Sequence, residues 1–396
     1  MDLIDAVPTS LRLVRGLDVA SEELSVPTWV VVPLFRFVSG RSALAAARRP
    51  SARLSPLRLT AHVGEDFRHL MEGLRRTCEC MLYLLRRSGG RLGHATALGV
   101  DPSLWAESVG SLMMPIEERL WDLVFEWRVY AHYRLPVELA AAAPPQRALR
   151  IESDIRELSE QVFRHPHEPT ELAEAHHVLH QLWCPPVAAS EPMELGLMPF
   201  ARALRRVDWD RVRSGATVHA LLEAYREEEE LFRCGQQLVE ITLEESEIAA
   251  LRTVQDAMRR LAGARGIVVE VNPSSNLLIG NLLDLRNHPI LRLFPPEPRD
   301  DAPPPVPIAV GSDDPVTFST HLLREYALLY EAAKGAGYPE RVVHEWLATI
   351  RQTSVDARFT EPWRPSARRV AGALRDELDE YLQRPRRVDA RRTAWS

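Results

Sequence analysis

Short apolar runs alternate with stretches of helical periodicity in the first hundred residues. Residues 11–19 (LRLVRGLDV) and 57–63 (LRLTAHV) are rich in apolar and β-branched side chains and end in polar ones, which is typical of buried strands. From Phe67 onward, apolar positions recur at three- and four-residue spacing, which predicts an amphipathic helix that stops at Gly89-Gly90. Residues 91–95 (RLGHA) then predict another strand. Strand, helix and strand at these lengths predict a parallel βαβ sheet.

The pattern changes after Gly99. Residues 99–265 contain strongly helix-forming segments such as EAYREEEELF, with charged exposed faces, and we interpret this stretch as an all-helical insertion. The β/α rhythm resumes in residues 266–276 (GIVVEVNPSSN) and 307–315 (PIAVGSDDP). We expect helices at residues 318–334, 339–353 and 365–382, then a short basic end. The expected domains are 1–98 and 266–364 with the strands, 99–265 with the insertion, and 365–396 with the last helix and tail.

Composition narrows the choice of environment. Apolar residues make up 45% of the chain and charged residues 26%, and the net charge of −6 offers no general reason to expect nucleic-acid binding. The four cysteines form no CxxC pair, so we expect packing residues in a reducing, cytoplasmic compartment. No signal peptide is recognisable, and the apolar run of residues 26–38 is interrupted by Arg36 and is too short to cross a bilayer, so we expect no membrane.

Candidate chemistry follows three predicted strands. His62 and Glu65 lie in AHVGEDF, His94 in RLGHA, and the pair Asp313-Asp314 in VGSDDP. The carboxyl ends of the strands in a parallel barrel carry its active site, where imidazole and carboxylate groups can bind Zn²⁺ or move protons. Each motif also has a simpler interpretation: His62, Glu65 and His94 as structural groups at strand ends, and Ser312-Asp313 as a helix cap.

Other histidines and polar groups carry weaker signals. Ser274, Ser275 and Asn276 in EVNPSSN supply hydrogen-bonding groups at a strand end. We expect no metal-ligand pair at His165-Pro166-His167, because no strand precedes it. His176 and His180 have helical i, i+4 spacing and could bind a metal, but we expect them on a solvated helix face.

The order in which the motifs occur along the chain is more specific than any one motif. GLDVASEE, HVGE, RLGHA, EVNPSSN and SDDP occur in one sequence and resemble, in that order, the motifs of the adenosine deaminase family of metal-dependent hydrolases. Residues 318–333 (FSTHLLREYALLYEAA) also resemble the helix with an L-x-x-E-Y pattern in that family. The resemblance implies an α/β fold, the last five strands of a TIM-type (β/α) barrel interrupted by the insertion.

The resemblance also implies roles for individual residues. His62 and Asp313 would be zinc ligands, and Glu65 would protonate the purine ring nitrogen next to the attacked carbon. His94 would assist deprotonation of the attacking water, and Asp314 would orient that water. A sixth residue, Gly16, would offer its backbone N–H to the purine.

One family feature has no counterpart. Members carry an H-x-H zinc-ligand pair on a strand well before the GLDV-like strand, and here that strand begins about ten residues from Met1. We therefore expect either a zinc deaminase of adenosine or an adenine nucleotide completed by another polypeptide, or a non-catalytic protein that binds a purine or another subunit. AMP or purine-base deamination is a third possibility that the motifs do not separate. An open five-stranded sheet argues for a partner or a homo-oligomer in each case.

A helical insertion at this position also resembles the deaminase component of the RADAR anti-phage system. That narrower resemblance implies a partner ATPase and a large homo-oligomer.

Overall fold

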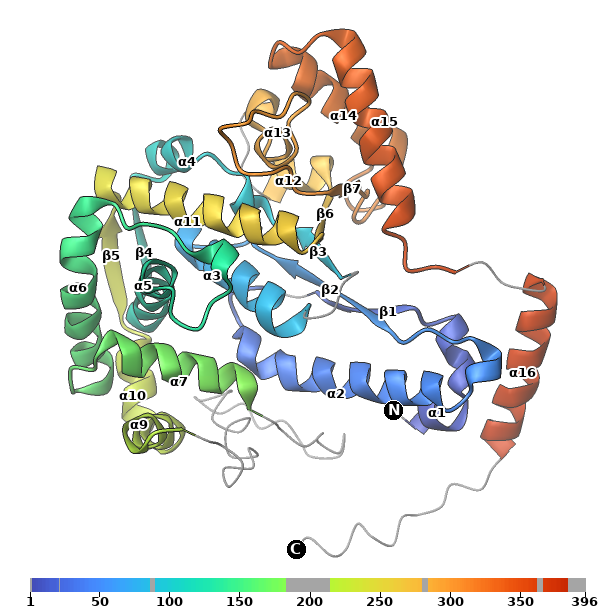
Figure 1. Cartoon of the computed structure of the whole chain (residues 1–396), viewed down its shortest axis with the longest axis horizontal. Coiled ribbons are helices and arrows are strands. Elements are labelled where there is room, and N and C mark those ends of the chain that lie inside the picture. Colours follow the sequence, from blue (N-terminus) through green and yellow to red (C-terminus); the bar gives the residue numbers. More distant parts are fainter. Residues whose placement is uncertain are drawn as a thin grey trace, which may run out of the picture. The chain divides into compact units, whose positions relative to one another are not determined.

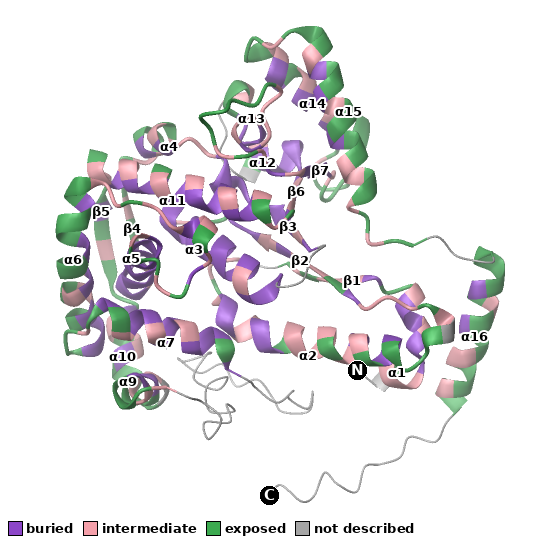
Figure 2. Cartoon of the chain, in the orientation of Figure 1, coloured by how far each residue is buried: buried purple, intermediate pink, exposed green. Residues whose placement is uncertain are grey.

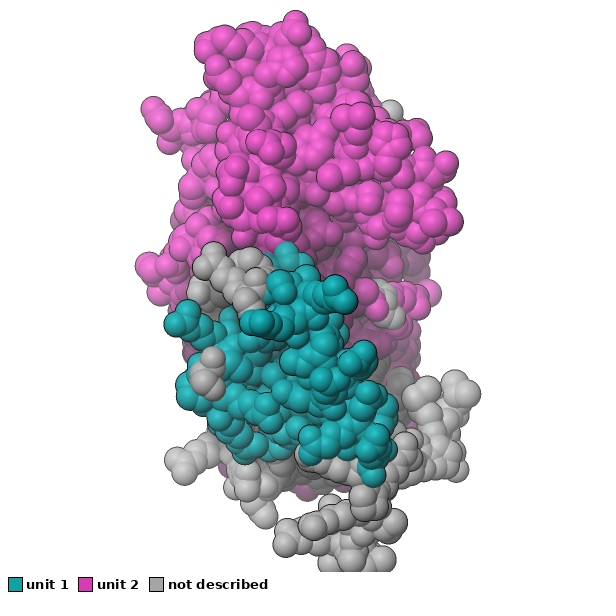
Figure 3. Space-filling view, turned by 90° about the vertical axis from the view of Figure 1, so that its right-hand side faces the viewer, with its two compact units in different colours: residues 1–17, 36–58, 359–396 teal, residues 18–35, 59–358 magenta. Residues whose placement is uncertain are grey.

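The computed structural model describes residues 2–20, 22–85, 90–182, 214–279, 284–361 and 366–383. Two compact units make up the chain (Figure 3). The smaller unit comprises Met1–Leu17, Arg36–Arg58 and Phe359–Ser396, and the larger comprises Asp18–Phe35 and Leu59–Arg358. The predicted domain boundaries follow motifs rather than compactness, and they stay predictions.

A five-stranded sheet has the order β1-β2-β3-β6-β7 (Figure 1). The pairs β2–β3, β3–β6 and β6–β7 are parallel, which confirms the predicted parallel α/β sheet. Whether the sheet belongs to a closed barrel stays a prediction. The strands are β1 Gly16–Val19, β2 Arg58–Val63, β3 Arg91–His94, β6 Val268–Val271 and β7 Ile308–Val310.

The prediction of a strand at residues 11–19 is wrong for the first half of that segment. Pro8–Arg12 form a 3₁₀ helix, and the extended segment begins at Gly16. Pro8 at the start of this turn has a fixed φ that suits a helical turn, and this local preference prevails over the apolar alternation of LRLV.

Helices cover the sheet and bury its apolar side chains. α3 (Leu70–Glu79) continues into a π-helical turn at Cys80–Leu84, close to the helix that the periodicity predicts. α3 and α11 (Glu245–Ala264) pack against each other, and the strands and these helices share one apolar core. Along the β7 side lie α14 (Leu322–Gly335) and α15 (Glu340–Asp356), and α12 (Pro273–Ile279) follows β6.

The insertion is not all-helical, so that prediction is wrong. In the described part of the insertion, two strands, β4 (Ser111–Pro115) and β5 (Leu238–Thr242), pair in antiparallel register. In β5, Val239 and Ile241 are more buried than their neighbours Leu238, Glu240 and Thr242, so a period of two does operate over five residues. This pattern is too short to stand out between long helices. The helices are α4 Pro102–Val109, α5 Ile116–Ala131, α6 Pro145–Phe163, α7 Pro169–Gln181, α9 Ala216–Glu227, α10 Glu229–Gly235 and α11 Glu245–Ala264.

A second apolar core holds the insertion helices together. α5 is buried around most of its circumference, and Figure 2 shows α5 and α3 largely in purple. Leu120, Val124 and Leu172 are among the fully buried side chains of this core. Because α3 and α5 are buried on several sides, even their charged side chains lie in the interior.

The helix α2 (Thr28–Ala47) is longer than the apolar run from which we expected no membrane span. It has 20 residues and a mean hydropathy of 1.4, so by length and composition alone it could cross a membrane. A core helix of a globular protein passes the same test. Trp29 at its start and Ala45 near its end belong to separate apolar cores, although only 28% of the helix window is buried.

The smaller unit contains α1 (Asp2–Ala6) and α16 (Ala367–Gln383). Arg15 donates to the Leu11 carbonyl oxygen at 2.6 Å and pairs with Glu361 at 2.9 Å within this unit. The predicted last helix is thus confirmed from Ala367 onward, whereas the basic end RPRRVDARR lies outside the described residues.

Candidate metal and active site

Three of the predicted residues meet at the carboxyl ends of the parallel strands. His62 lies on β2, His94 ends β3, and Asp313 follows β7. One ligand atom from each lies within 4.8 Å of the others, and the two imidazole ring centres are 5.0 Å apart. The strands run parallel with Val63 opposite His94, so their carboxyl ends lie at one edge of the sheet. The convergence that the motif order predicts is therefore present.

Glu65 and Asn276 position His94. The Asn276 side-chain oxygen accepts from the Asn272 N–H at 3.1 Å, so its amide nitrogen points to Glu65 Oε1, 2.7 Å away. Glu65 Oε2 lies 3.0 Å from Nδ1 of His94. Asn276 Nδ2 also lies 3.1 Å from this Nδ1. When Nδ1 carries the proton, it can donate to Glu65, and the lone pair of Nε2 then faces Asp313 Oδ2, 3.9 Å away. His94 is thus oriented to bind a metal or to accept a proton.

Asp18 orients His62 in the way that Glu65 orients His94, through Nδ1 of the imidazole. Its Oδ2 lies 2.9 Å from Nδ1 of His62, so that Nδ1 carries the proton and Nε2 is free. The hydrogen bond with Asp18 raises the pKa of His62, against the opposing effect of burial, and the charges of Asp313 and Glu270 add to it. Carboxylates in this position orient the histidine ligands of many metal sites.

Two of the converging residues have unusual backbone conformations. His94 has φ of 60° and Asp313 has φ of 53°, both in the left-handed region. For residues with a Cβ this conformation costs about 1–2 kcal/mol each. Such strain persists where the surrounding structure enforces it and is concentrated at functional sites.

Glu23 holds the loop that carries Glu65. Its carboxylate accepts from the backbone N–H groups of Gly64 (2.6 Å), Glu65 (3.2 Å) and Asp66 (3.4 Å). Burial raises the pKa of Glu23, and these three bonds partly offset that effect. Gly64 has φ of 78°, and a Cβ there would lie 2.5 Å from Thr77 Oγ1, so the turn requires glycine.

Glu325 supports the NPSSN segment from α14. Its carboxylate accepts from Ser274 N (2.8 Å) and Ser274 Oγ (2.6 Å), and from the hydroxyl of Thr320. The L-x-x-E-Y pattern at residues 322–326 therefore has a structural role, because its glutamate fixes the turn before Asn276.

The other two predicted residues are placed differently. The Asp314 carboxylate accepts from Val316 N (3.0 Å) and Thr317 N (3.2 Å) and from the Thr317 hydroxyl, so it caps the turn after β7. These hydrogen bonds lower the pKa of Asp314. Gly16 begins β1 in the smaller unit. The roles proposed for Asp314 and Gly16 stay predictions.

The donor set suits a divalent transition metal. Two imidazoles and one carboxylate are ordinary zinc ligands, with metal–ligand distances of about 2.0–2.2 Å. At such distances tetrahedral ligand atoms lie about 3.4 Å apart, so the ligand atoms of His62, His94 and Asp313, which lie within 4.8 Å of one another, would move closer together around one ion. His94, which the resemblance implies as a base, is here available as a ligand as well.

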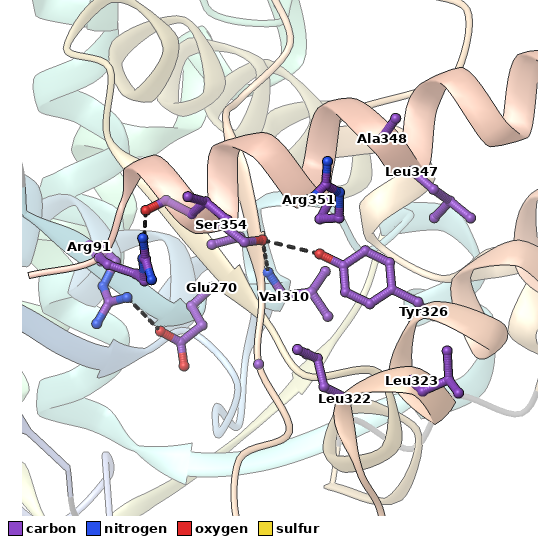
Figure 4. A pocket seen from close by; sticks show the side chains of 14 residues that line it. Arg91, Glu270, Val310, Leu322, Leu323, Tyr326, Leu347, Ala348, Arg351 and Ser354 are labelled. Atoms are coloured by element: carbon purple, nitrogen blue, oxygen red, sulfur yellow. Dashed lines mark hydrogen bonds and ion pairs between the residues drawn. The ribbon is translucent and has the colours of Figure 1, made fainter. Parts of the chain in front are cut away.

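A cavity of about 730 Å³ lies beside β7 (Figure 4). Glu270 lines it and shares a row of the sheet with Gly93 and His62, so the cavity lies on the face of the sheet that carries His62. Arg91 pairs with Glu270 at 3.5 Å. The remaining wall is mainly apolar, with Leu322, Leu323, Tyr326 and Leu347. Its size falls in the usual range for small-molecule pockets.

Asp18 and Glu23 lie in the GLDVASEE motif and had no predicted role, whereas Asn276 was predicted only as a hydrogen-bonding group at a strand end; the structure joins all three to the predicted residues. Their positions in the motifs were the available signal. Sequence reasoning also misplaced His176 and His180, which are buried on α7 rather than solvated. Cys78 and Cys80 are buried as expected of packing residues, and burial raises the pKa of the Cys78 thiol to about 12. Cys184 lies outside the described residues.

The comparisons with known proteins point to deaminases. No family model matches the chain. Over 113 residues it is 44% identical to an aminodeoxyfutalosine deaminase of Acidothermus cellulolyticus, a match covering 26% of this chain and 30% of that protein. It is also 33% identical over 113 residues to an adenine deaminase of Rhizobium leguminosarum, a match covering 28% of this chain and 30% of the relative. The aminodeoxyfutalosine deaminase of Streptomyces coelicolor is 34% identical over 117 residues, a match covering 30% of this chain and 25% of that protein. The chain thus spans less than a third of the curated relatives it matches.

Proposed function

We propose that this chain is part of a zinc-dependent hydrolytic deaminase that acts on an adenine-type ring, as adenosine or an adenine nucleotide. The observation that carries the proposal is the convergence of His62, His94 and Asp313 with Glu65 at one end of the sheet. The partial similarity to adenine deaminase and aminodeoxyfutalosine deaminase supports the same class of reaction.

The metal would be held by His62 and Asp313, together with the ligands of the H-x-H strand proposed below. A bound zinc ion would act as a Lewis acid that lowers the pKa of the attacking water. Asp18 and Glu65 would keep the Nδ1 protons of the two histidines away from the ion, so that each Nε2 is available.

The acid–base steps belong to His94 and Glu65. His94 would take the proton of the water that adds to the ring carbon bearing the amino group. Glu65 would donate a proton to the adjacent ring nitrogen. His94 would pass the proton taken from water to the amino group, which leaves as ammonia, and the added hydroxyl would return its proton to Glu65 as the carbonyl forms. Asn276 would hold the Glu65 carboxyl group in place through its 2.7 Å hydrogen bond.

We further propose that full activity needs an H-x-H strand from another polypeptide or another part of a longer chain. Among the described residues β7 has one strand neighbour, β6, so its other edge could pair with a further strand. At that outer edge the Val310 N–H donates to Ser354 Oγ at 2.9 Å (Figure 4), so a docking strand would have to displace this side chain. The narrower expectation of a defence role with a partner ATPase and a homo-oligomer rests on the position of the insertion alone.

The test is ammonia release from adenosine, AMP and adenine by the zinc-loaded chain, alone and after co-expression with the H-x-H-containing segment of an aminodeoxyfutalosine deaminase. We expect release in the co-expressed sample, loss of at least about 10²-fold in Glu65→Gln, and no change in Glu22→Gln, an exposed neighbour. Release by the chain alone would support the deaminase and refute the need for a second segment. No release in any sample, or equal release by Glu65→Gln, would refute the deaminase.

A further inference from the structure

A second cluster of metal-ligating side chains lies away from the strand ends, inside the larger unit. It joins Glu79 on α3 to His176 and His180 on α7. One ligand atom from each residue lies within 4.8 Å of the others, and all three residues are buried. The two histidines are four residues apart and therefore share one face of their helix.

The distances suit one shared ion. Nε2 of His176 lies 2.9 Å from Glu79 Oε1, and Nε2 of His180 lies 3.6 Å from Glu79 Oε2. Tetrahedral ligands of zinc are separated by about 3.4 Å, which lies between these two values. The imidazole ring centres of the histidines are 4.5 Å apart.

His180 is held as a metal ligand is usually held. Its Nδ1 donates to the backbone carbonyl oxygen of His176 at 2.8 Å, which leaves the lone pair on Nε2. The Tyr83 ring stacks on His180 at 4.5 Å and fixes the ring plane. Nε2 of His180 is buried and makes no hydrogen bond, and His180 is only 1% exposed. A lone pair so placed, facing a carboxylate, is unfavourable unless a proton or a metal cation lies between them.

Two arginines compete for the same ligands. Arg75 donates to Glu79 Oε1 at 3.1 Å, but it also pairs with Asp122 at 2.8 Å and with Glu118, so its charge is divided among three carboxylates. Arg128 Nη1 lies 3.4 Å from His176 Nδ1, a long contact. Metal binding at Nε2 would move the His176 proton to Nδ1 and turn Arg128 away.

We propose that Glu79, His176 and His180 form a second divalent-metal site that binds zinc and links α7 of the insertion to α3 beside the sheet. Its place between two buried helices gives it a structural role, in which metal binding stabilises the folded state. The site is independent of the deaminase function proposed above.

The test uses the full chain in a background with His62→Ala and Asp313→Ala, which removes two ligands of the strand-end site. Zinc is titrated against a chromophoric chelator, and cobalt is substituted to read the coordination from its visible spectrum. We expect one zinc equivalent per chain in this background, a tetrahedral cobalt spectrum, and a rise in melting temperature on adding zinc.

Two variants identify the ligands. His180→Asn and Glu79→Gln in this background should each abolish the tight equivalent, the cobalt spectrum and the zinc-induced rise in melting temperature. The control is His177→Asn on the same helix, whose Nδ1 contacts the Tyr83 hydroxyl at 3.1 Å instead, and it should retain all three signals. Circular dichroism checks that each variant is folded; because Glu79→Gln preserves side-chain volume, it remains informative if His180→Asn fails to fold.

The proposal would be refuted by a background protein that binds no zinc, because the cluster is then a metal-free buried ion network. Undiminished zinc binding in both His180→Asn and Glu79→Gln would refute it as well. Equal loss in His177→Asn would attribute the effect to damage of α7 and would also contradict the proposal.

Discussion

The Oδ2 atom of Asp18 lies 2.9 Å from Nδ1 of His62, and this contact determines which nitrogen of His62 is free at the strand ends. Asp18 follows Leu17 on β1 and His62 lies on β2, so adjacent strands of the sheet bring the pair together. A carboxylate behind a histidine ligand makes that ligand more basic and fixes its orientation.

Asp18→Asn should weaken zinc binding at the strand ends by about tenfold or more at pH 8, because the amide neither makes His62 more basic nor fixes its orientation as the carboxylate does. The difference in zinc affinity between the native protein and Asp18→Asn should become smaller toward pH 6. Asp18 raises the pKa of His62, so protons compete more strongly with zinc in the native protein. Zinc titrations at both pH values measure this. Asp66→Asn, an exposed acid on the same loop as Glu65, is the control and should bind zinc normally.

Gly64→Ala should destabilise the protein by about 2 kcal/mol or more, because the residue has φ of 78° and the new Cβ would meet Thr77 Oγ1 at 2.5 Å. Adding Thr77→Ala should recover part of the loss by removing the clash but not the backbone strain. Urea unfolding measures both. In contrast, Gly40→Ala on α2 has open space around its Cβ and should be neutral or stabilising. Full tolerance of Gly64→Ala would contradict the geometry described for this loop.

Asn276→Asp should be tolerated in acid and harmful at neutral pH. The introduced carboxyl would face Glu65 Oε1, now 2.7 Å from the Asn276 amide, and two ionised carboxylates at that distance repel. In the folded state the introduced group binds a proton more tightly than in the unfolded state, so its penalty grows as the pH rises. The melting temperature of the variant should therefore lie further below that of the native protein at pH 8 than at pH 5. Asn287→Asp, at an exposed position, should show no such trend.

The buried imidazole of His288 should make the free energy of unfolding decrease as the pH is lowered below neutrality. It is fully buried, and burial lowers its pKa from 6.5 to about 4, so the unfolded chain binds the proton more readily. The stabilisation is fully present above pH 6.5 and is lost progressively as the pH falls toward 4, by about 2 kcal/mol between pH 7 and pH 5. His288→Asn, whose side-chain oxygen can accept from Ile290 N as Nδ1 does now, should flatten this dependence in urea titrations. The exposed His344→Asn should leave it unchanged, and an equally steep profile in His288→Asn would refute the assignment.

Local pattern was enough for much of the fold. The apolar runs before His62 and His94 are strands, and the three- and four-residue spacing after Phe67 is a helix, because periods of two and 3.6 are properties of the backbone itself. The carboxyl ends of parallel strands meet at one edge, so the order of the motifs also predicted that His62, His94 and Asp313 would converge.

The short strands β4 and β5 escaped this reasoning. Five residues of alternation do not stand out among helices, and each strand is formed only because the other pairs with it from more than a hundred residues away. Spacing on α7 likewise placed His176 and His180 on one face but did not show whether that face meets water or protein.

The sequence alone thus determined which side chains stand at the strand ends and which histidines share a helix face, because both follow from the repeat of the local backbone. Only the tertiary structure decided their partners: Asp18 for His62, Asn276 for Glu65, and Glu79 for His176, a residue 97 positions away. Such pairs depend on how elements distant in the chain pack together, and burial then decides their protonation and the chemistry open to them.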